Sequence, residues 1–201
     1  TGYTFGGWWT GTSGSGTQLT NGSYTPASPY GSKTFYAKWT ANNYTVTYEY
    51  NSATGGNGTA SSSYTTGGTA ITLPTPTRTG YTFGGWYSDS GLTSSIGAAG
   101  DSYSPSGGTL SLNAYAKWTA NTNNAITWDD QTPTSASSGG SSTYTTDQAV
   151  STIPTTPPTK TGYTFGGWWT GTSGSGTQLT NGSYTPASPY GSKTFYAKWT
   201  A

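Results

Sequence analysis

The sequence predicts a mostly β protein with little or no helix, built from small modules that repeat in tandem. Short segments alternate apolar and polar residues with a period of two, which is typical of half-buried strands. Gly, Pro, Thr and Ser interrupt every candidate helical period. Two motifs recur at a spacing of about 80 residues, and such a spacing is the signature of a repeat protein.

The repeats define the organisation of the chain. Residues 1–41 and 161–201 are identical at every position. The motif Gly-Tyr-Thr-Phe-Gly-Gly-Trp occupies 2–8, 80–86 and 162–168, and Tyr-Ala-Lys-Trp-Thr occupies 36–40, 115–119 and 196–200. Two modules thus make a period of about 160 residues. We interpret the chain as one such period of a longer array, followed in 161–201 by the start of the next.

Two complete modules are predicted, at residues 44–119 and 125–200. Residues 1–40 are predicted to be the C-terminal half of a further module. Short polar joints, 41–43 and 120–124, separate them. Because joints this short leave little slack, we expect neighbouring modules to pack end to end in an elongated array.

Each complete module is expected to begin with an alternating strand. In residues 44–50, Val46 and Tyr48 lie on the predicted inner face, and Ile126 and Trp128 take the matching places in the next module.

A second and a third strand follow in each module. The second is predicted near residues 70–74, matched by 150–154, and the prolines after it end the strand. The third is predicted at 80–83. Gly84-Gly85 then indicates a bulge, after which Trp86 returns to the core.

The last strand is predicted at residues 112–118, with Ala114 and Ala116 facing inward and Lys117 outward, and its C-terminal copy places Phe195 inward. The stretch before it is rich in Gly and Ser. Hairpin-type turns are indicated there by Asn21-Gly22 and Asn181-Gly182, and short strands are expected around Tyr24, Tyr103 and Tyr184.

Aromatic rings are expected to supply the core, because so small a module with few aliphatic residues has little else to bury. Packing between modules is expected to add what one module lacks. The predicted core anchors are Tyr3, Phe5, Trp8, Trp39, Tyr81, Phe83, Trp86, Trp118, Trp128, Tyr163, Phe165, Trp168 and Trp199.

The composition argues against several classes of function. The chain has no His and no Cys, so Ser-His-Asp, Cys-His and the usual zinc sites lack their residues. Seven basic residues and a net charge of +1 do not suit nucleic-acid binding. No apolar run is long enough to span a membrane. We therefore expect no enzyme, no cofactor, no metal, no nucleic-acid partner and no membrane span in this segment.

The motifs resemble the Listeria–Bacteroides repeat, a family that includes the B repeats of internalin-type surface proteins. The resemblance rests on residues 71–87, which contain the Gly-Tyr-Thr-Phe-Gly-Gly-Trp motif, and on the Tyr-Ala-Lys-Trp-Thr motif at 115–119. It covers essentially the whole chain. It implies a small β-grasp-like module, secreted and strung in tandem on bacterial surface proteins and adhesins, and it brings no catalytic residues.

Adjacent aromatic residues give the most suggestive candidate site. Neighbours on a strand point to opposite faces, so one ring of each Trp-Trp or Trp-Tyr pair is expected to be exposed. The outer rings Trp9, Tyr87 and Trp169 are candidates for stacking on sugars. The alternative, which we favour, is that they pack against a neighbouring module or chain.

Two further site hypotheses are weaker. Lys38, Lys117 and Lys198 invite comparison with isopeptide-forming lysines, but residues 1–41 contain no acidic residue, and a solvated surface lysine is the favoured interpretation. Asp129-Asp130 with Asp147 suggest a calcium site, but the other module does not repeat the cluster.

The leading functional hypothesis is a structural repeat segment of a secreted bacterial surface protein, located outside the cell. It would act as a stiff stalk, an adhesin spacer or a self-assembling fibre. Its expected partners are neighbouring modules, identical chains and, as candidates, surface glycans or host proteins. The alternative is a carbohydrate-binding repeat.

Overall fold

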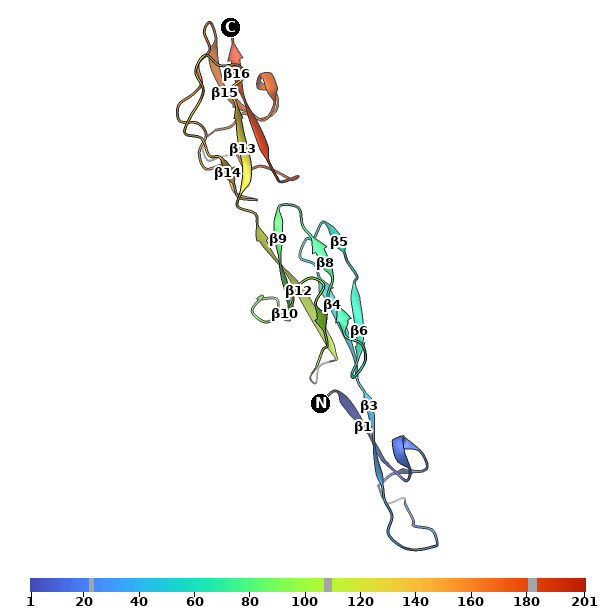
Figure 1. Cartoon of the computed structure of the whole chain (residues 1–201). Helices are drawn as coiled ribbons and strands as arrows, with labels where there is room; N and C mark the ends of the chain where they lie inside the picture. The colour runs from blue at the N-terminus through green and yellow to red at the C-terminus, as the bar shows by residue number, and fades with distance from the viewer. Residues whose placement is uncertain (22–23, 107–109, 181–183) are drawn as a thin grey trace. The chain divides into compact units, whose positions relative to one another are not determined.

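A computed structural model describes residues 1–21, 24–106, 110–180 and 184–201. Strands provide the regular structure (Figure 1). In the described ranges the helical segments are two single turns of 3-10 helix, Thr12–Gly14 and Thr172–Gly174. The prediction of a mostly β chain with almost no helix is confirmed.

The chain divides into two compact units. The first comprises Thr1–Asn51, Asn57–Thr75 and Gly85–Lys117. The second comprises Ser52–Gly56, Pro76–Gly84 and Trp118–Ala201.

The N-terminal residues form a three-stranded antiparallel sheet in the order β2-β1-β3. Its strands are β1 (Tyr3–Trp9), β2 (Gln18–Leu19) and β3 (Tyr36–Ala41). The register of β1 against β3 shifts between Phe5 and Trp8, across Gly6-Gly7. Gly7 has a φ of +93°, which glycine adopts without strain. The bulge predicted at Gly84-Gly85 is thus present at its first copy.

The following repeat forms a five-stranded sheet in the order β10-β9-β12-β4-β6. Its strands are β4 (Asn43–Glu49), β6 (Ser61–Thr65), β9 (Tyr81–Tyr87), β10 (Ser95–Gly97) and β12 (Ser111–Ala120). Strand β4 is parallel to β12 and antiparallel to β6. Two small two-stranded sheets accompany this sheet. One is the antiparallel pair of β7 (Ile71–Thr72) with β11 (Ser102–Tyr103), and the other joins β5 (Gly55–Asn57) to β8 (Thr75–Thr77).

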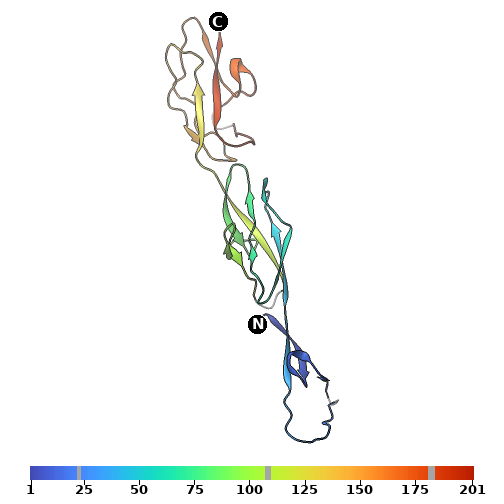
Figure 2. The same cartoon turned by 45° about the vertical axis from the view of Figure 1, so that its right-hand side comes forward.

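The C-terminal repeat reproduces the central part of that topology. Its sheet has the order β14-β13-β16-β15. The strands are β13 (Asn124–Asp129), β14 (Thr143–Tyr144), β15 (Thr164–Trp169) and β16 (Lys193–Thr200). Strands β13 and β16 are parallel, and Figure 2 shows them side by side in yellow and red. The register of β15 against β16 again shifts at the glycine pair, between Phe165 and Trp168.

Aromatic residues dominate both cores. In β4 the burial alternates as predicted, with Tyr44, Val46 and Tyr48 buried and the residues between them exposed. Tyr48 lies 5.0 Å from the buried ring of Trp86, measured between ring centroids. In the second unit the corresponding contact joins Trp128 to Trp168, also at 5.0 Å.

Some predicted strands did not form. Residues 150–154 lie outside any strand. Ser151 stands where the other repeat has the buried Ile71, and Val150 joins Tyr184 through one backbone hydrogen bond of 2.9 Å. The strand expected near Tyr103 is β11, whereas Tyr24 and Tyr184 lie outside strands. The predicted turns fall on Gly22 and on residues 181–182, outside the described residues.

Candidate functional site

The predicted core anchors fall into three groups by exposure. Trp86 and Trp168 are fully buried. Another group is partly buried: Tyr81, Phe83, Trp118, Trp128, Phe165 and Trp199. The rest are exposed by between 46% and 60%: Tyr3, Phe5, Trp8, Trp39 and Tyr163. Four of these five lie in the N-terminal half repeat, whose sheet has no counterpart of β13 among the described residues.

Other buried residues were not among the predicted anchors. Val150, Leu179 and Phe195 each expose no more than 3% of their surface. Phe195 was on the predicted inner face of its strand, but Leu179 lies in a Gly-rich and Ser-rich stretch without periodicity. Nothing in the local sequence pattern marks Leu179 as buried.

The outer rings Trp9, Tyr87 and Trp169 are each covered by a lysine of their own repeat. The ammonium of Lys38 lies 5.1 Å from the centroid of the Trp9 ring. The same distance is 5.1 Å from Lys117 to Tyr87 and 5.0 Å from Lys198 to Trp169. Cation–π contacts of this kind are favourable. The lysines and the outer rings, which the sequence suggested as two separate candidate sites, therefore form one pair that recurs in each repeat.

Glycines make room for the lysine stem. A Cβ on Gly166 would lie 3.2 Å from Cδ of Lys198, and a Cβ on Gly174 would lie 2.5 Å from it. The indole N–H of Trp169 donates to the carbonyl of Gly166 at 3.1 Å. One face and the polar edge of this ring are thus already engaged within the repeat, which favours a structural role for the Lys–Trp pair.

The three aspartates considered for calcium are not brought together. The carboxylate of Asp129 accepts the N–H of Gln131 at 2.9 Å, and that of Asp130 accepts the N–H of Ser137 at 3.0 Å. Asp147 binds two tyrosine hydroxyls elsewhere. Across the described ranges, no group of three or more acidic residues is placed to hold a metal ion.

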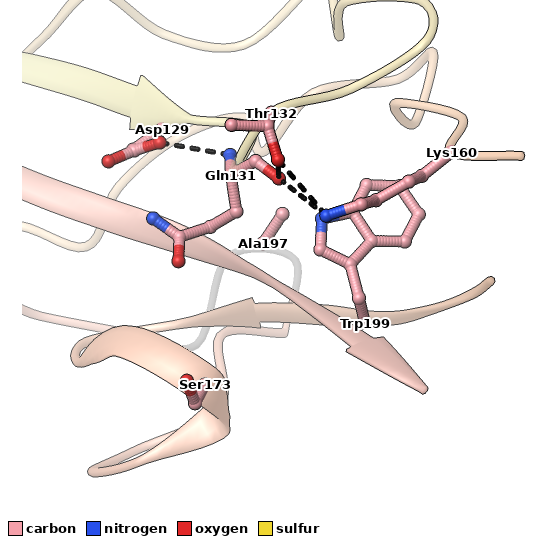
Figure 3. Close-up of a pocket in the computed structure, with 7 residues that line it drawn as sticks. All are labelled: Asp129, Gln131, Thr132, Lys160, Ser173, Ala197 and Trp199. Carbon is pink, nitrogen blue, oxygen red and sulfur yellow. Dashed lines mark hydrogen bonds between the residues drawn. The ribbon is translucent and has the colours of Figure 1, made fainter. Parts of the chain in front are cut away.

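A polar recess of 470 Å³ lies beside Trp199 in the second unit (Figure 3). The ammonium of Lys160 donates to the carbonyl of Gln131 at 3.2 Å and to the hydroxyl of Thr132 at 3.0 Å. It also lies 5.9 Å from the centroid of the Trp199 ring. The recess therefore combines an indole with charged and amide groups. The residues that line it are Asp129, Gln131, Thr132, Lys160, Ser173, Ala197 and Trp199.

A hydrogen-bonded joint connects two repeats within the second unit. The N–H of Asn121 donates to the carbonyl of Gly80, and the N–H of Thr146 donates to the carbonyl of Asn121, both at 2.9 Å. The Thr146 side chain is buried, and its hydroxyl also donates to the Gly80 carbonyl at 2.8 Å. The amide of Asn124 donates to the Thr146 hydroxyl at 3.1 Å. These bonds hold Gly80 of one repeat against Thr146 of the next.

The same joint occurs within the first unit. The N–H of Asn42 donates to the carbonyl of Gly2 at 2.9 Å, and the N–H of Thr66 donates to the carbonyl of Asn42 at 3.0 Å. The residues of this joint occupy the same places in their repeats as those of the other. The joint is therefore a property of the repeat rather than of one pair of modules.

Asp147 adds side-chain bonds to the second joint, where the first has Gly67. The hydroxyls of Tyr81 and Tyr190 both donate to the Asp147 carboxylate. The bond to Asp147 raises the pKa of Tyr190, because ionisation would lose that bond and place a phenolate beside a carboxylate. The guanidinium of Arg78 lies 3.7 Å from the centroid of the Tyr81 ring. Gly80 has a φ of +82°, and any side chain there would meet the Tyr190 ring.

Comparison with known proteins agrees with the repeat organisation. The chain belongs to the Listeria-Bacteroides repeat domain family, whose model matches residues 1–38, 44–111 and 125–198. This is the family that the motifs predicted. It is a tandem repeat domain of surface proteins and not an enzyme family.

Two relatives from Evansella cellulosilytica align with most of the chain. One, named "Putative Gly-rich membrane protein", is 34% identical over 175 residues, which are 84% of this chain and 18% of that relative. The other, named "Putative membrane protein", is 32% identical over 169 residues, which are 82% of this chain and 23% of that relative. The chain thus spans less than a quarter of the length of either.

No solved structure matches the chain. Among the described residues, no helix has the length and apolar character needed to cross a membrane.

Proposed function

We propose that this chain is a load-bearing spacer from a bacterial surface protein, exposed outside the cell and built from β-grasp-like repeats. Each complete repeat has a mixed sheet whose two central strands are parallel, which fits a β-grasp-like module. The names of the two relatives, both described as membrane proteins, support a protein of the cell envelope. In this role the chain holds a distance between an anchored part and a presented part of a longer protein.

The recurring joint is the observation that carries the proposal. A flexible linker of Gly and Ser places no bonds between the modules it connects. Here, by contrast, the backbone of Asn42 and of Asn121 bonds in both directions, because each N–H donates to a glycine carbonyl and each carbonyl accepts the N–H of a threonine. Such bonds resist bending at the joint, which is what a stalk or an adhesin spacer requires. Only 6% of the residues are charged, which removes repulsion between chains and supports lateral association into a fibre.

Small-angle X-ray scattering of the chain tests the spacer role. We expect a pair-distance distribution with the long tail of a rod, unchanged by moderate salt. A variant with a Gly-Ser insertion after Asn121 breaks the joint while leaving both repeats intact. Its maximum dimension should become shorter, and its pair-distance distribution should become broader. A matched insertion after Gly31, in an exposed loop, is the control. Identical scattering from the joint variant and the control would contradict the proposal.

Carbohydrate binding is a second proposal. Partly exposed rings recur at Trp9, Tyr87 and Trp169, and the polar recess beside Trp199 offers an indole with hydrogen-bonding groups (Figure 3). Glycan-array binding by the chain should disappear in the Trp9→Ala, Trp169→Ala double variant or in Trp199→Ala. A folded chain that binds no glycan would remove this proposal and leave the spacer role in place.

A further inference from the structure

Two tyrosines from successive repeats share one carboxylate at the second joint. The hydroxyl of Tyr81 donates to Oδ2 of Asp147, and the hydroxyl of Tyr190 donates to Oδ1 of the same residue. The centroids of the two tyrosine rings lie 6.4 Å apart, and the ring planes meet at 85°. Because one carboxylate binds both hydroxyls, the ring carbons ortho to each hydroxyl lie beside the same small group.

The chain around the two rings holds them in place. The Tyr190 ring lies against the backbone of Gly80, where a Cβ would come within 2.4 Å of the ring atom Cδ2. The guanidinium of Arg78 lies 3.7 Å from the centroid of the Tyr81 ring, which is a favourable cation–π contact. All of these residues belong to the second unit. The pair is therefore part of one compact unit.

The first joint forms without this cluster. Gly67 stands in the place of Asp147 and has no side chain that could accept a hydroxyl. Tyr3 is the counterpart of Tyr81, and its hydroxyl lies 3.2 Å from where a Cβ on Gly67 would be. The backbone bonds of that joint are nevertheless present. The shared carboxylate is thus an addition to the second joint and not a requirement of the joint itself.

Two other tyrosine pairs lie at similar distances in different surroundings. The ring centroids of Tyr44 and Tyr64 are 6.1 Å apart, and those of Tyr48 and Tyr50 are 6.3 Å apart. Tyr44, Tyr64 and Tyr48 expose no more than 9% of their surface, whereas both rings at the joint are only partly buried. The pair at the joint is therefore within reach of an oxidant in the solvent, and each of the other pairs contains a buried ring.

We propose that Tyr81 and Tyr190 form an oxidative cross-linking site, at which an oxidant of the peroxidase class joins the two repeats through a dityrosine bond. The oxidant is hydrogen peroxide acting through a haem peroxidase, so that two tyrosines and one peroxide give one dityrosine and two waters. The product makes the hydrogen-bonded joint covalent. The inference goes beyond the spacer role and does not rest on it, because it depends only on the geometry of this cluster.

The carboxylate takes part in the coupling as a base. A tyrosine loses an electron more readily when its hydroxyl proton can leave at the same time, and Asp147 is already hydrogen-bonded to that proton. Each tyrosine in turn gives one electron to the oxidant and one proton to Asp147, which passes the proton to water.

The bond then forms between ring carbons. Loss of the hydroxyl protons removes the bonds that hold the rings edge to face, so the rings turn on the timescale of side-chain rotation. The two phenoxyl radicals pair at their ortho carbons and form a C–C bond. Each of these carbons then loses its hydrogen as a proton through water, and each phenolic oxygen regains one, which restores both phenols.

Peroxidase treatment of the full chain at low protein concentration tests the proposal. Tryptic peptides 1–33 and 161–193 have the same sequence, so the Tyr30→Phe chain is used to give them different masses. We expect a product that joins peptide 79–117 to peptide 161–193 and is lighter than their sum by two hydrogen atoms. Fragment spectra should place the link at Tyr81 and Tyr190, in a chain that stays monomeric on a denaturing gel.

Matched variants separate this site from general oxidation of tyrosine. Tyr190→Phe should abolish the product, whereas Tyr30→Phe should retain it, although Tyr30 has the same neighbours in sequence and is 82% exposed. Asp147→Asn keeps an oxygen that accepts hydrogen bonds but is a much weaker base, so it should slow the coupling at least about tenfold. Circular dichroism checks that each variant is folded.

Three results would overturn the inference. The first is the absence of the product that joins peptides 79–117 and 161–193, including the case in which tyrosines couple only between chains. The second is a product that survives Tyr190→Phe. The third is an unchanged rate of coupling in Asp147→Asn. None of these results would affect the scattering test of the spacer role.

Discussion

Replacing Trp86 and Trp168 by Phe gives two different results, although both rings occupy the same place in their repeats. Trp86 is 0% exposed and its indole N–H donates to the carbonyl of Pro74 at 2.9 Å. Trp168 is 1% exposed, and its indole N–H has no hydrogen-bond acceptor among the described residues. The volume removed by Trp→Phe is the same at both sites. The difference between the two variants in free energy of unfolding therefore reports on the indole N–H group.

The expected difference in free energy of unfolding follows from the cost of leaving a buried polar group without a hydrogen bond, which is about 1–3 kcal/mol. Trp86→Phe leaves the Pro74 carbonyl without this donor, whereas Trp168→Phe removes a donor that was already unpaired. Taking the low end for each effect, Trp86→Phe should cost at least about 2 kcal/mol more free energy of unfolding than Trp168→Phe.

Hydrogen exchange measures both repeats in one experiment, because β4 and β13 have unique sequences. Relative to the unaltered chain, Trp86→Phe should accelerate exchange in β4 at least about thirtyfold more than Trp168→Phe accelerates exchange in β13. Equal acceleration at the two sites would refute the reasoning, since it would mean that the indole N–H groups contribute equally.

Three further predictions concern the joint and the loops. The pKa of Tyr190 should lie above the usual range of a tyrosine because its hydroxyl donates to Asp147. The contribution of Tyr190 to the stability of the joint should therefore be complete below about pH 10 and be lost as the pH rises through the higher folded pKa. Ultraviolet titration should show the raised pKa, and Asp147→Asn should abolish it. Asp89 accepts backbone N–H bonds from Ser94 and Thr93, which lower its pKa. Its contribution to the free energy of unfolding should be present above the ordinary carboxyl pKa and be lost only as the pH falls through the lowered pKa. An NMR titration of the carboxyl carbon checks this, and a normal pKa would contradict it. Gly174→Ala should destabilise the C-terminal repeat by about 1–2 kcal/mol, because φ is +78° and the new Cβ would meet Lys198, whereas Gly31→Ala, in open space, should be neutral in thermal unfolding.

The regular elements were predictable wherever a strand alternates. Val46 and Tyr48 face the core because period two places them on one side, and the glycine bulge follows from two glycines within a strand. The two recurring motifs also predicted the family by resemblance, and the family model confirms that prediction. These features depend only on residues that are close together in the sequence, so they can be predicted without knowledge of tertiary contacts.

The burial of the aromatic anchors was not predictable from local sequence. Trp8 and Trp168 lie in segments of identical sequence, yet one is half exposed and the other is buried. The pairing of Lys198 with Trp169 was also missed, because it joins β16 to β15, which are separated by a long irregular stretch of chain. Both depend on contacts between distant segments, and no periodicity in the sequence reports them.

The joints between repeats lie between these two cases. Short polar linkers were recognised, but the hydrogen bonds from Thr66 and Thr146 to the linker asparagines were not, since Thr is common throughout the sequence. Only the recurrence of Thr-Thr at the same place in both complete repeats, followed by Gly67 or Asp147, offered a signal.

The fixed joint is the central claim, and a distance measurement between spin labels tests it most directly. The chain contains no cysteine, so Thr119→Cys with Thr200→Cys places one label at equivalent exposed positions of two successive repeats, both within the second unit. Electron–electron double resonance should give a single narrow distance distribution, which broadens when Gly and Ser are inserted after Asn121. A broad distribution in the chain without the insertion would contradict the account.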